Sequence, residues 1–259
     1  MVALNSMETD HIILETKDLC KNFGALRAVD LVNLQIAGGK VHSIIGPNGA
    51  GKTTLFNLLT GFLPITHGKI LFNGTEITNL PPHKISKMGI ARSFQITSIF
   101  PDLTVHENIR IAIQSRTKFN YNFLTHFKNL KGIGERLGQV LEEVGLAQKA
   151  HTIAKNLSYG ERRAVDIGIA MATEPNLLLL DEPTSGMSEE ESSRIIGLIK
   201  DISARLTVVL IEHNIDVVLS ISDIVTVMHQ GQIIGEGRPD EIQENQKVQE
   251  AYLGGYKLA

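Results

Sequence analysis

Apolar positions along the chain follow two different periods. Three short runs are apolar without alternation, VHSIIG at 41–46, NLLLLDEP at 176–183 and TVVLIEH at 207–213. Strands that are buried on both faces of a parallel sheet have this composition. Helical patterns follow these runs at residues 52–60, 189–204 and 215–221. Strand and helix in alternation predict an α/β fold around a mainly parallel sheet.

Other parts of the chain have a different pattern. Residues 11–23 and 68–77 alternate between apolar and polar, and the Asn-Gly pair at 73–74 predicts a hairpin. A second hairpin is expected to turn at Gln230–Gly231. Residues 100–156 are polar and helical, with one apolar face that comprises Leu137, Val140, Leu141 and Val144. We therefore expect an N-terminal antiparallel β-subdomain and an inserted helical subdomain.

Composition narrows the class of protein. The net charge is −3 with both signs interleaved, which argues against a nucleic-acid partner. No apolar run approaches the ~20 residues of a membrane-spanning helix, and residues 1–10 do not resemble a signal peptide. Cys20 is the single cysteine, so no internal disulfide forms. These features predict a cytosolic protein whose membrane role, if it has one, depends on a partner.

The clearest motif is GPNGAGKT at residues 46–53, which matches the phosphate-loop pattern G-x-x-x-x-G-K-[ST]. Glycines allow successive N–H groups to turn toward an anion, and the following helix directs its positive end at the same place. Lys52 is expected to contact the β- and γ-phosphates, and the Thr53 hydroxyl to bind Mg²⁺. The predicted nucleotide-binding residues of this loop are Gly46, Pro47, Asn48, Gly49, Ala50, Gly51, Lys52, Thr53 and Thr54.

Two carboxylates end the second apolar run. Asp181 fits the acidic residue that holds Mg²⁺ in phosphate-loop ATPases, and Glu182 is a candidate general base for water. His213 ends the next run, where a neutral imidazole can contact a γ-phosphate. The alternative is a solvated acidic pair and a structural histidine at strand ends. Gln95 carries an amide that can reach Mg²⁺ or water, and taken alone it is a weak signal.

The stretch LSYGERR at residues 157–163 is a second helix start. Ser158 and Glu161 have the spacing of a capping box, with Ala164, Val165, Ile167 and Met171 on the inward face of the helix that follows. Capping alone leaves Gly160 unexplained, since glycine permits a close backbone approach. We interpret the stretch as the second half of a site whose first half lies elsewhere.

Together these residues resemble a known family. The set 46–54, Gln95, LSYGE, LLLLDE at 177–182 and His213 is similar, in order and spacing, to the ATP-binding subunit of ABC transporters over residues 12–254. In that family two ATPase subunits pack head to tail, and each ATP lies between the phosphate loop of one and the signature loop of the other. The resemblance implies a nucleotide-binding core at 12–96 and 157–259 and a helical subdomain at 97–156, which touches membrane subunits.

The resemblance also assigns roles. It implies ATP and Mg²⁺ as cofactors, with Thr53, Gln95 and Asp181 at the metal. Glu182 becomes the catalytic base, His213 the switch histidine and Gln95 the Q-loop. The signature residues that contact the partner's ATP are Ser158, Tyr159, Gly160 and Glu161. Phe23 is assigned to adenine stacking, although its residue type alone favours a core aromatic.

Finer features resemble the ATPases of branched-chain amino-acid importers. They are QITSIFP at 95–101, the insertion at 114–131, LSYGERR, IEHN at 211–214 and AYLGG at 251–255. The expected partners are a second ATPase subunit (a copy or a sister chain), two transmembrane permeases and, indirectly, an extracytoplasmic binding protein. The expected location is peripheral, on the cytoplasmic face of the membrane.

Alternatives and departures accompany this resemblance. The chain is also similar to urea or amide importer ATPases and to a lipopolysaccharide-export ATPase. A soluble ABC ATPase of DNA repair or translation is disfavoured by the single cassette and single cysteine, and a regulator without turnover by the presence of Glu182 and His213. Tyr159 and Glu161 replace the usual Gly and Gln of the signature, and Ser188 replaces the usual Asp of the D-loop. These departures concern coupling between subunits.

Overall fold

The computed structural model describes residues 11–93, 99–116 and 132–253, and within these ranges a mainly parallel sheet forms the centre. In spatial order its strands are β11 (Gln232–Gly237), β10 (Ile224–His229), β4 (Val41–Ile45), β9 (Thr207–Ile211), β8 (Leu177–Asp181) and β7 (Ile90–Ser93). Neighbours are parallel except β10 and β11. Every residue of β4, β8 and β9 is buried, which confirms the interpretation of the three apolar runs.

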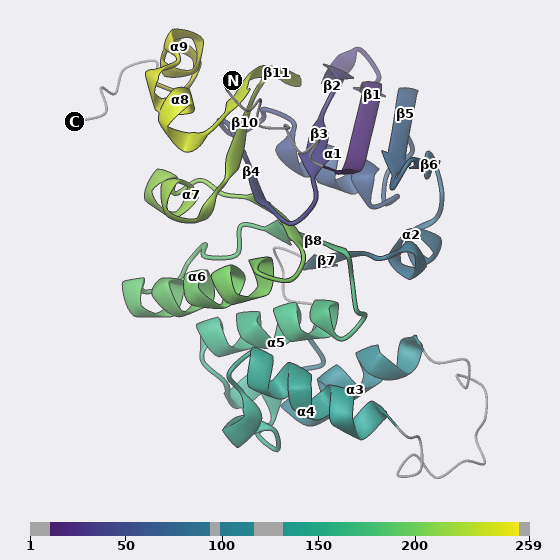
Figure 1. Ribbon diagram of the computed structural model, residues 1–259, viewed down its shortest axis with the longest axis vertical. Helices are drawn as coiled ribbons and strands as arrows, with labels where there is room; N and C mark the ends of the chain where they lie inside the picture. Colours follow the sequence, from purple (N-terminus) through teal and green to yellow (C-terminus); the bar gives the residue numbers. More distant parts are fainter. Residues whose placement is uncertain (1–10, 94–98, 117–131, 254–259) are drawn as a thin grey trace, which may run out of the picture.

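A second, antiparallel sheet lies at one end of the molecule (Figure 1). It comprises β1 (Ile12–Phe23), β2 (Leu26–Val32), β3 (Gln35–Ala37), β5 (His67–Phe72) and β6 (Thr75–Glu76). Its β5–β6 hairpin turns at Asn73 and Gly74, which have φ of 47° and 72°, as a type I′ turn requires. The β10–β11 hairpin turns at Gln230 and Gly231, with φ of 48° and 82°. Both predicted hairpins are confirmed.

Helices fill the space around the sheets. Helix α1 (Lys52–Leu59) lies between them, since Leu55, Phe56 and Leu59 share one buried cluster with residues of β1, β4 and β8. The remaining helices of the core are α2 (Pro82–Met88), α6 (Glu189–Ser203), α7 (Ile215–Ile221), α8 (Pro239–Glu244) and α9 (Gln246–Leu253). The helices predicted at 52–60, 189–204 and 215–221 are thus confirmed to within a residue at each end.

Figure 1 shows α3 (Val105–Ser115) and α4 (Ile133–Glu143) at the end opposite the antiparallel sheet, beside α5 (Tyr159–Met171). Two 3₁₀ turns, Ala147–Lys149 and Ala154–Asn156, connect α4 to α5. The four residues of the predicted apolar face, three in α4 and Val144 directly after it, are all buried, and they share a cluster with residues of α5 and α6. The helical subdomain boundaries at 97 and 156 stay a prediction, and the first of them lies outside the described residues.

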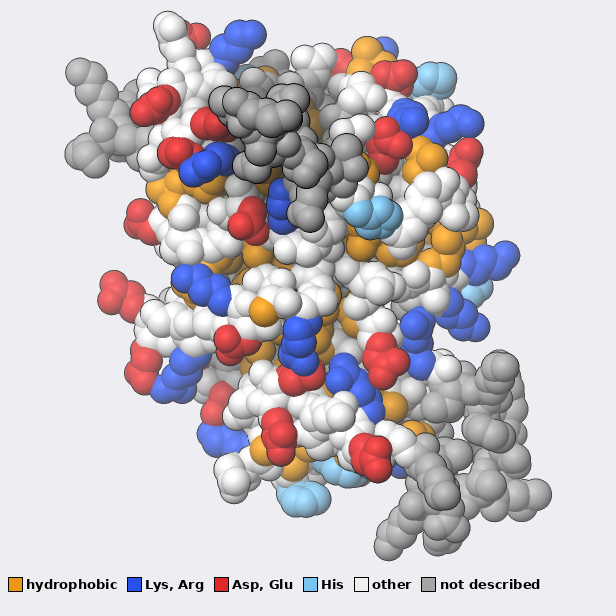
Figure 2. Space-filling model, in the orientation of Figure 1, with side chains coloured by type: hydrophobic (Ala, Val, Ile, Leu, Met, Phe, Trp, Pro, Cys, Tyr) orange, Lys and Arg blue, Asp and Glu red, His pale blue; other side chains and the backbone are white. Residues whose placement is uncertain are grey.

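The surface carries both signs of charge. Figure 2 shows Lys and Arg interspersed with Asp and Glu over the face that it presents. Among the helices that the structure describes, none has the length and apolarity needed to cross a membrane.

Candidate functional site

The phosphate loop joins β4 to α1, and backbone from two other strands closes behind it. Gly46 and Gly51 have φ of 151° and 100°. A Cβ at Gly46 would lie 2.1 Å from the Met228 carbonyl oxygen, and one at Gly51 would lie 2.3 Å from that of Ala28. Only glycine fits at these two positions.

Hydrogen bonds fix the same loop from behind. The Gly231 N–H donates to the Ala50 carbonyl at 3.0 Å, and the Gly231 carbonyl accepts from the Asp30 N–H at 2.9 Å. The hairpin turn at Gln230–Gly231 therefore joins the loop to β2. Asn48, Gly49 and Thr53 face solvent, so the other side of the loop is open to a ligand.

Lys52 lies over this loop. Its ammonium donates to the carbonyls of Gly46 and Pro47, at 2.7 and 3.1 Å. Burial lowers the pKa of Lys52, while the carboxylates of Glu182 and Asp181 raise it. These three charged groups are therefore within electrostatic reach of one another, as a shared nucleotide site requires.

Asp181 ends β8 with its carboxylate almost fully buried. Arg92 donates to Oδ2 at 2.7 Å, whereas Oδ1 is buried without a hydrogen-bond partner. A buried carboxylate oxygen without a partner is costly unless a cation or donor reaches it, so Asp181 fits a hard cation such as Mg²⁺. Among the described residues, no group of three or more His, Cys, Asp or Glu side chains could hold a metal ion by itself.

Glu182 and His213 meet at the ends of β8 and β9. His213 Nε2 and Glu182 Oε1 are 2.9 Å apart, and the two side chains border a cleft of about 550 Å³. Glu182 has φ of 47°, a strained conformation for a residue with a side chain, and its N–H donates to the Ile211 carbonyl at 2.9 Å. The pair has the geometry of a base and the group that orients it.

The signature loop begins α5, and the predicted capping box is confirmed. Ser158 Oγ accepts from the Glu161 N–H at 3.3 Å, and Glu161 Oε2 accepts from the Ser158 N–H at 3.1 Å. Tyr159 is 42 % exposed and Gly160 is buried. Lys149 pairs with Glu161 and lowers the pKa of that carboxyl. Between the described residues of this loop and the phosphate loop we find no hydrogen bond or ion pair.

Phe23 and Gln95 are the two predicted site residues that remain to be placed. Phe23 is 46 % exposed at the end of β1, so the expectation of a core aromatic is wrong. The Lys21 ammonium lies 5.1 Å from its ring centroid, which leaves the aromatic surface accessible to a base only in part. Gln95 lies outside the described residues, as do most of the 114–131 insertion and the last residues of AYLGG.

Several buried polar residues near the site were not predicted. Arg163 and Asp166 of α5 are 3 % exposed, and Arg163 donates to the Asp181 carbonyl. Ser93 of β7 donates to Asp166. Glu212 accepts from the Thr184 N–H and hydroxyl at 3.0 and 2.7 Å. The burial of Arg163 and Asp166 could have been predicted from the helical period, because residues 163, 166 and 170 share the face of α5 that includes Ile167.

Comparisons with known proteins agree with this geometry. A family model described as ABC transporter matches residues 29–185, and one described as branched-chain amino acid ATP-binding cassette transporter matches residues 232–257. The chain is 41 % identical to the high-affinity branched-chain amino acid transport ATP-binding protein BraF of Pseudomonas aeruginosa, over 93 % of this chain and 98 % of BraF. It is 38 % identical to the corresponding protein LivG of Escherichia coli, again over 93 % and 98 %.

Comparison with solved structures identifies the same family. A nucleotide-free ATP-binding cassette from an ABC transporter superposes with a TM-score of 0.82 at 33 % identity, covering 94 % of this chain and 99 % of the other. The ADP conformation of the cassette MJ1267 superposes with a TM-score of 0.81 at 34 % identity, with the same coverage. The predicted fold, a phosphate-loop core with an antiparallel β-subdomain and a helical subdomain, is confirmed.

Proposed function

The chain belongs to the ABC transporter family of ATP-binding proteins, and from this we propose that it hydrolyses ATP to drive an importer of branched-chain amino acids. The substrate class is supported by the relatives BraF and LivG and by the second family model at residues 232–257. The observation that carries the hydrolytic function is the Glu182–His213 pair, 2.9 Å apart, beside a complete phosphate loop. Urea, amides and exported lipids stay alternative cargoes.

The chemistry is phosphoryl transfer to water, which proteins catalyse mainly by positioning and electrostatics. Lys52 would bind the β- and γ-phosphates, and Thr53 and Asp181 would hold Mg²⁺, which would supply neutralisation of phosphate charge. Glu182 accepts a proton from the attacking water, and His213 orients this carboxylate through Nε2. Phe23 offers its exposed ring to the adenine, and Gln95 is assigned to the metal or the water by resemblance alone.

The working unit contains two ATPase subunits. Following the head-to-tail packing that the family resemblance implies, we propose that Ser158, Tyr159, Gly160 and Glu161 of the other subunit complete each ATP site. Binding of ATP closes the pair, and hydrolysis with release of phosphate reopens it. The subunit lies peripherally at the cytoplasmic face of the membrane, held by two permeases that receive substrate from an extracytoplasmic binding protein.

We propose that the permeases dock in a cleft of the core that is bordered by Phe62, α2, β7 and the C-terminal end of α5. This cleft has a volume of about 300 Å³, and Phe62 on its border is 51 % exposed. An exposed aromatic beside a cleft suits a partner helix. We expect Phe62→Glu to reduce co-purification with the permeases while the ATPase rate of the isolated chain stays native. Native co-purification would place the permeases elsewhere.

The hydrolytic role is tested by Glu182→Gln. This change keeps the size of the side chain but removes the base, so the rate of phosphate release should fall about 100- to 10,000-fold. Fluorescent-nucleotide titration should give a native dissociation constant for ATP, and size-exclusion chromatography with ATP should show a dimer. Glu190→Gln, at an exposed position of helix α6, is the matched control. A native rate in Glu182→Gln would remove Glu182 from the role of base.

A further inference from the structure

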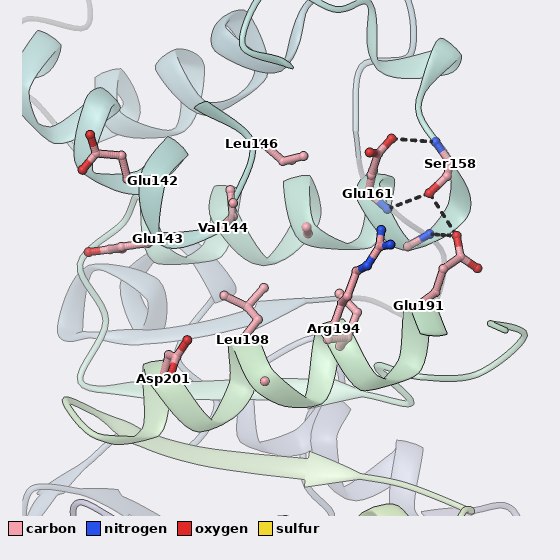
Figure 3. Close-up of a pocket in the computed structure, with 15 residues that line it drawn as sticks. Glu142, Glu143, Val144, Leu146, Ser158, Glu161, Glu191, Arg194, Leu198 and Asp201 are labelled. Carbon is pink, nitrogen blue, oxygen red and sulfur yellow. Dashed lines mark hydrogen bonds between the residues drawn. The ribbon is translucent and has the colours of Figure 1, made fainter. Parts of the chain in front are cut away.

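One carboxylate joins the starts of two helices. Glu191 of α6 accepts through Oε1 from the Ser158 hydroxyl at 2.9 Å and from the Gly160 N–H at 3.0 Å. Its Oε2 accepts from the Ser188 N–H at 3.3 Å and from the Ser188 hydroxyl at 3.4 Å. Figure 3 shows Glu191 reaching from α6 to the start of α5, beside Arg194. Glu191 therefore caps α6 and α5 together.

This arrangement accounts for the residue types at two positions, Gly160 and Ser188. A Cβ at Gly160 would lie 3.1 Å from both Cβ and Cγ of Glu191, so a side chain there would crowd the carboxylate. Ser188 is the N-cap of α6 and forms a capping box with Glu191. An aspartate at position 188, the usual residue of the D-loop, would place a second carboxylate beside the first. Ser188 avoids that repulsion.

The hydrogen-bond donors around Glu191 stabilise its negative charge. Hydrogen bonds from Gly160 N–H, from Ser158 and from Ser188 lower the pKa of Glu191, so the carboxyl is ionised at neutral pH. The nearby cations pair with other groups, since Arg194 binds Glu190 and Lys149 binds Glu161. Within the described part of the chain, no ion pair to Glu191 is found.

We infer that Glu191 is an internal anion that occupies the signature loop until the γ-phosphate of the partner subunit's ATP displaces it. This inference rests on the proposed function, in which Ser158 and Gly160 help to complete the partner subunit's ATP site, and it assigns that phosphate to the Ser158 hydroxyl and the Gly160 N–H. Each of these donors has a single hydrogen to offer, so the two anions compete for them. Glu191 thus holds the donors in place and opposes closure. Its release also frees Ser188 and the loop that precedes α6.

The test measures how much ATP is needed for closure. In the Glu182→Gln background, Glu191→Gln should lower the ATP concentration at half-maximal dimer roughly fivefold, the scale of a weakened charged contact at an exposed site. Glutamine keeps an oxygen that accepts from Gly160, so folding is preserved. Dimer is measured by size-exclusion chromatography with light scattering. Glu190→Gln makes the same change in net charge one residue away and should leave the midpoint unchanged.

The outcomes separate the two proposals. A midpoint for Glu191→Gln that equals that of Glu190→Gln, or exceeds it, overturns the inference, since loss of a purely structural cap weakens dimerisation. If Glu182→Gln forms no ATP-dependent dimer with native Glu191 or with either variant, the proposed function fails and the inference fails with it. A dimer that forms at unchanged midpoints overturns the inference alone.

Discussion

At the scale of single residues, the backbone behind the phosphate loop decides which glycines are required. Gly51 has φ of 100° with the Ala28 carbonyl oxygen 2.3 Å from where a Cβ would lie. Gly49 has φ of 80° but open space around the same point. Both positions strain a side-chain-bearing residue, but only Gly51 also has a steric conflict.

Gly51→Ala should therefore destabilise the protein more than Gly49→Ala. We expect a loss in the free energy of unfolding of about 1 kcal/mol for Gly49→Ala, and at least about 2 kcal/mol more for Gly51→Ala because the loop must shift from β2. Denaturant unfolding measures both values. Equal losses would mean that the loop moves away from Ala28 at little cost.

Residue identity alone could predict the reactive groups but not their neighbours. Lys52, Asp181, Glu182 and His213 were found from strand ends and a motif. Their partners were not, because Arg92 contacts Asp181 across 89 positions of sequence and no local pattern reports such a pairing. The roles assigned to these residues stay predictions for the experiments above.

At the scale of elements, the start of α5 combines helix capping with recognition. A serine cap is worth about 1 kcal/mol, and the Ser158–Glu161 box accounts for the helix start without reference to a ligand. The chain offers a matched comparison, since Thr104 and Glu107 form the same box at the start of α3. Any role of Ser158 beyond capping should appear as a difference between substitutions at Ser158 and at Thr104.

Ser158→Ala and Thr104→Ala should each lower the free energy of unfolding by about 1 kcal/mol, since each removes one cap. Only Ser158→Ala should lose ATP-driven dimerisation in the Glu182→Gln background, since only Ser158 is proposed to contact the partner's ATP. Thermal unfolding and size-exclusion chromatography give the two readouts. Native dimerisation in Ser158→Ala would show that Ser158 is a cap and nothing more.

The bounds of helices and strands could be predicted better than the contacts between them. Strands β4, β8 and β9 are buried throughout, and the helices after them begin and end close to where their periodicity does. The inward face of α5 was predicted as apolar, yet it also buries Arg163 and Asp166. Burial of such charges depends on acceptors supplied by β8 and β7, which belong to the tertiary structure rather than to the helix.

At the scale of the whole molecule, a polar chain crosses three strands of the central sheet. His42 Nε2 of β4 lies 2.7 Å from the Thr226 hydroxyl of β10, and that hydroxyl donates to Glu236 of β11 at 2.7 Å. Burial lowers the pKa of His42 to about 4 from an ordinary value of 6.5. The folded protein therefore holds this imidazole neutral.

This arrangement makes stability fall in mild acid. Between pH 6.5 and about 4 the unfolded chain binds a proton at His42 that the folded chain does not, so the free energy of unfolding decreases as the pH falls. The contribution at pH 5 relative to pH 7.5 is about 2 kcal/mol. His42→Gln should remove that share of the pH dependence, and exposed His67→Gln should retain it. Denaturant unfolding at both pH values distinguishes them, and an unchanged slope in His42→Gln would assign the acid sensitivity elsewhere.

The order of strands in the central sheet has a consequence for biosynthesis. Strand β4, at residues 41–45, pairs with β9 and β10, which are made more than 160 residues later. At a synthesis rate of about 5–20 residues per second, the five residues of β4, all buried in the folded protein, wait on the order of ten seconds or more for their neighbouring strands. During this interval β4 is exposed to wrong pairing. The nucleotide loop that follows it takes its final shape only when the last quarter of the protein has emerged.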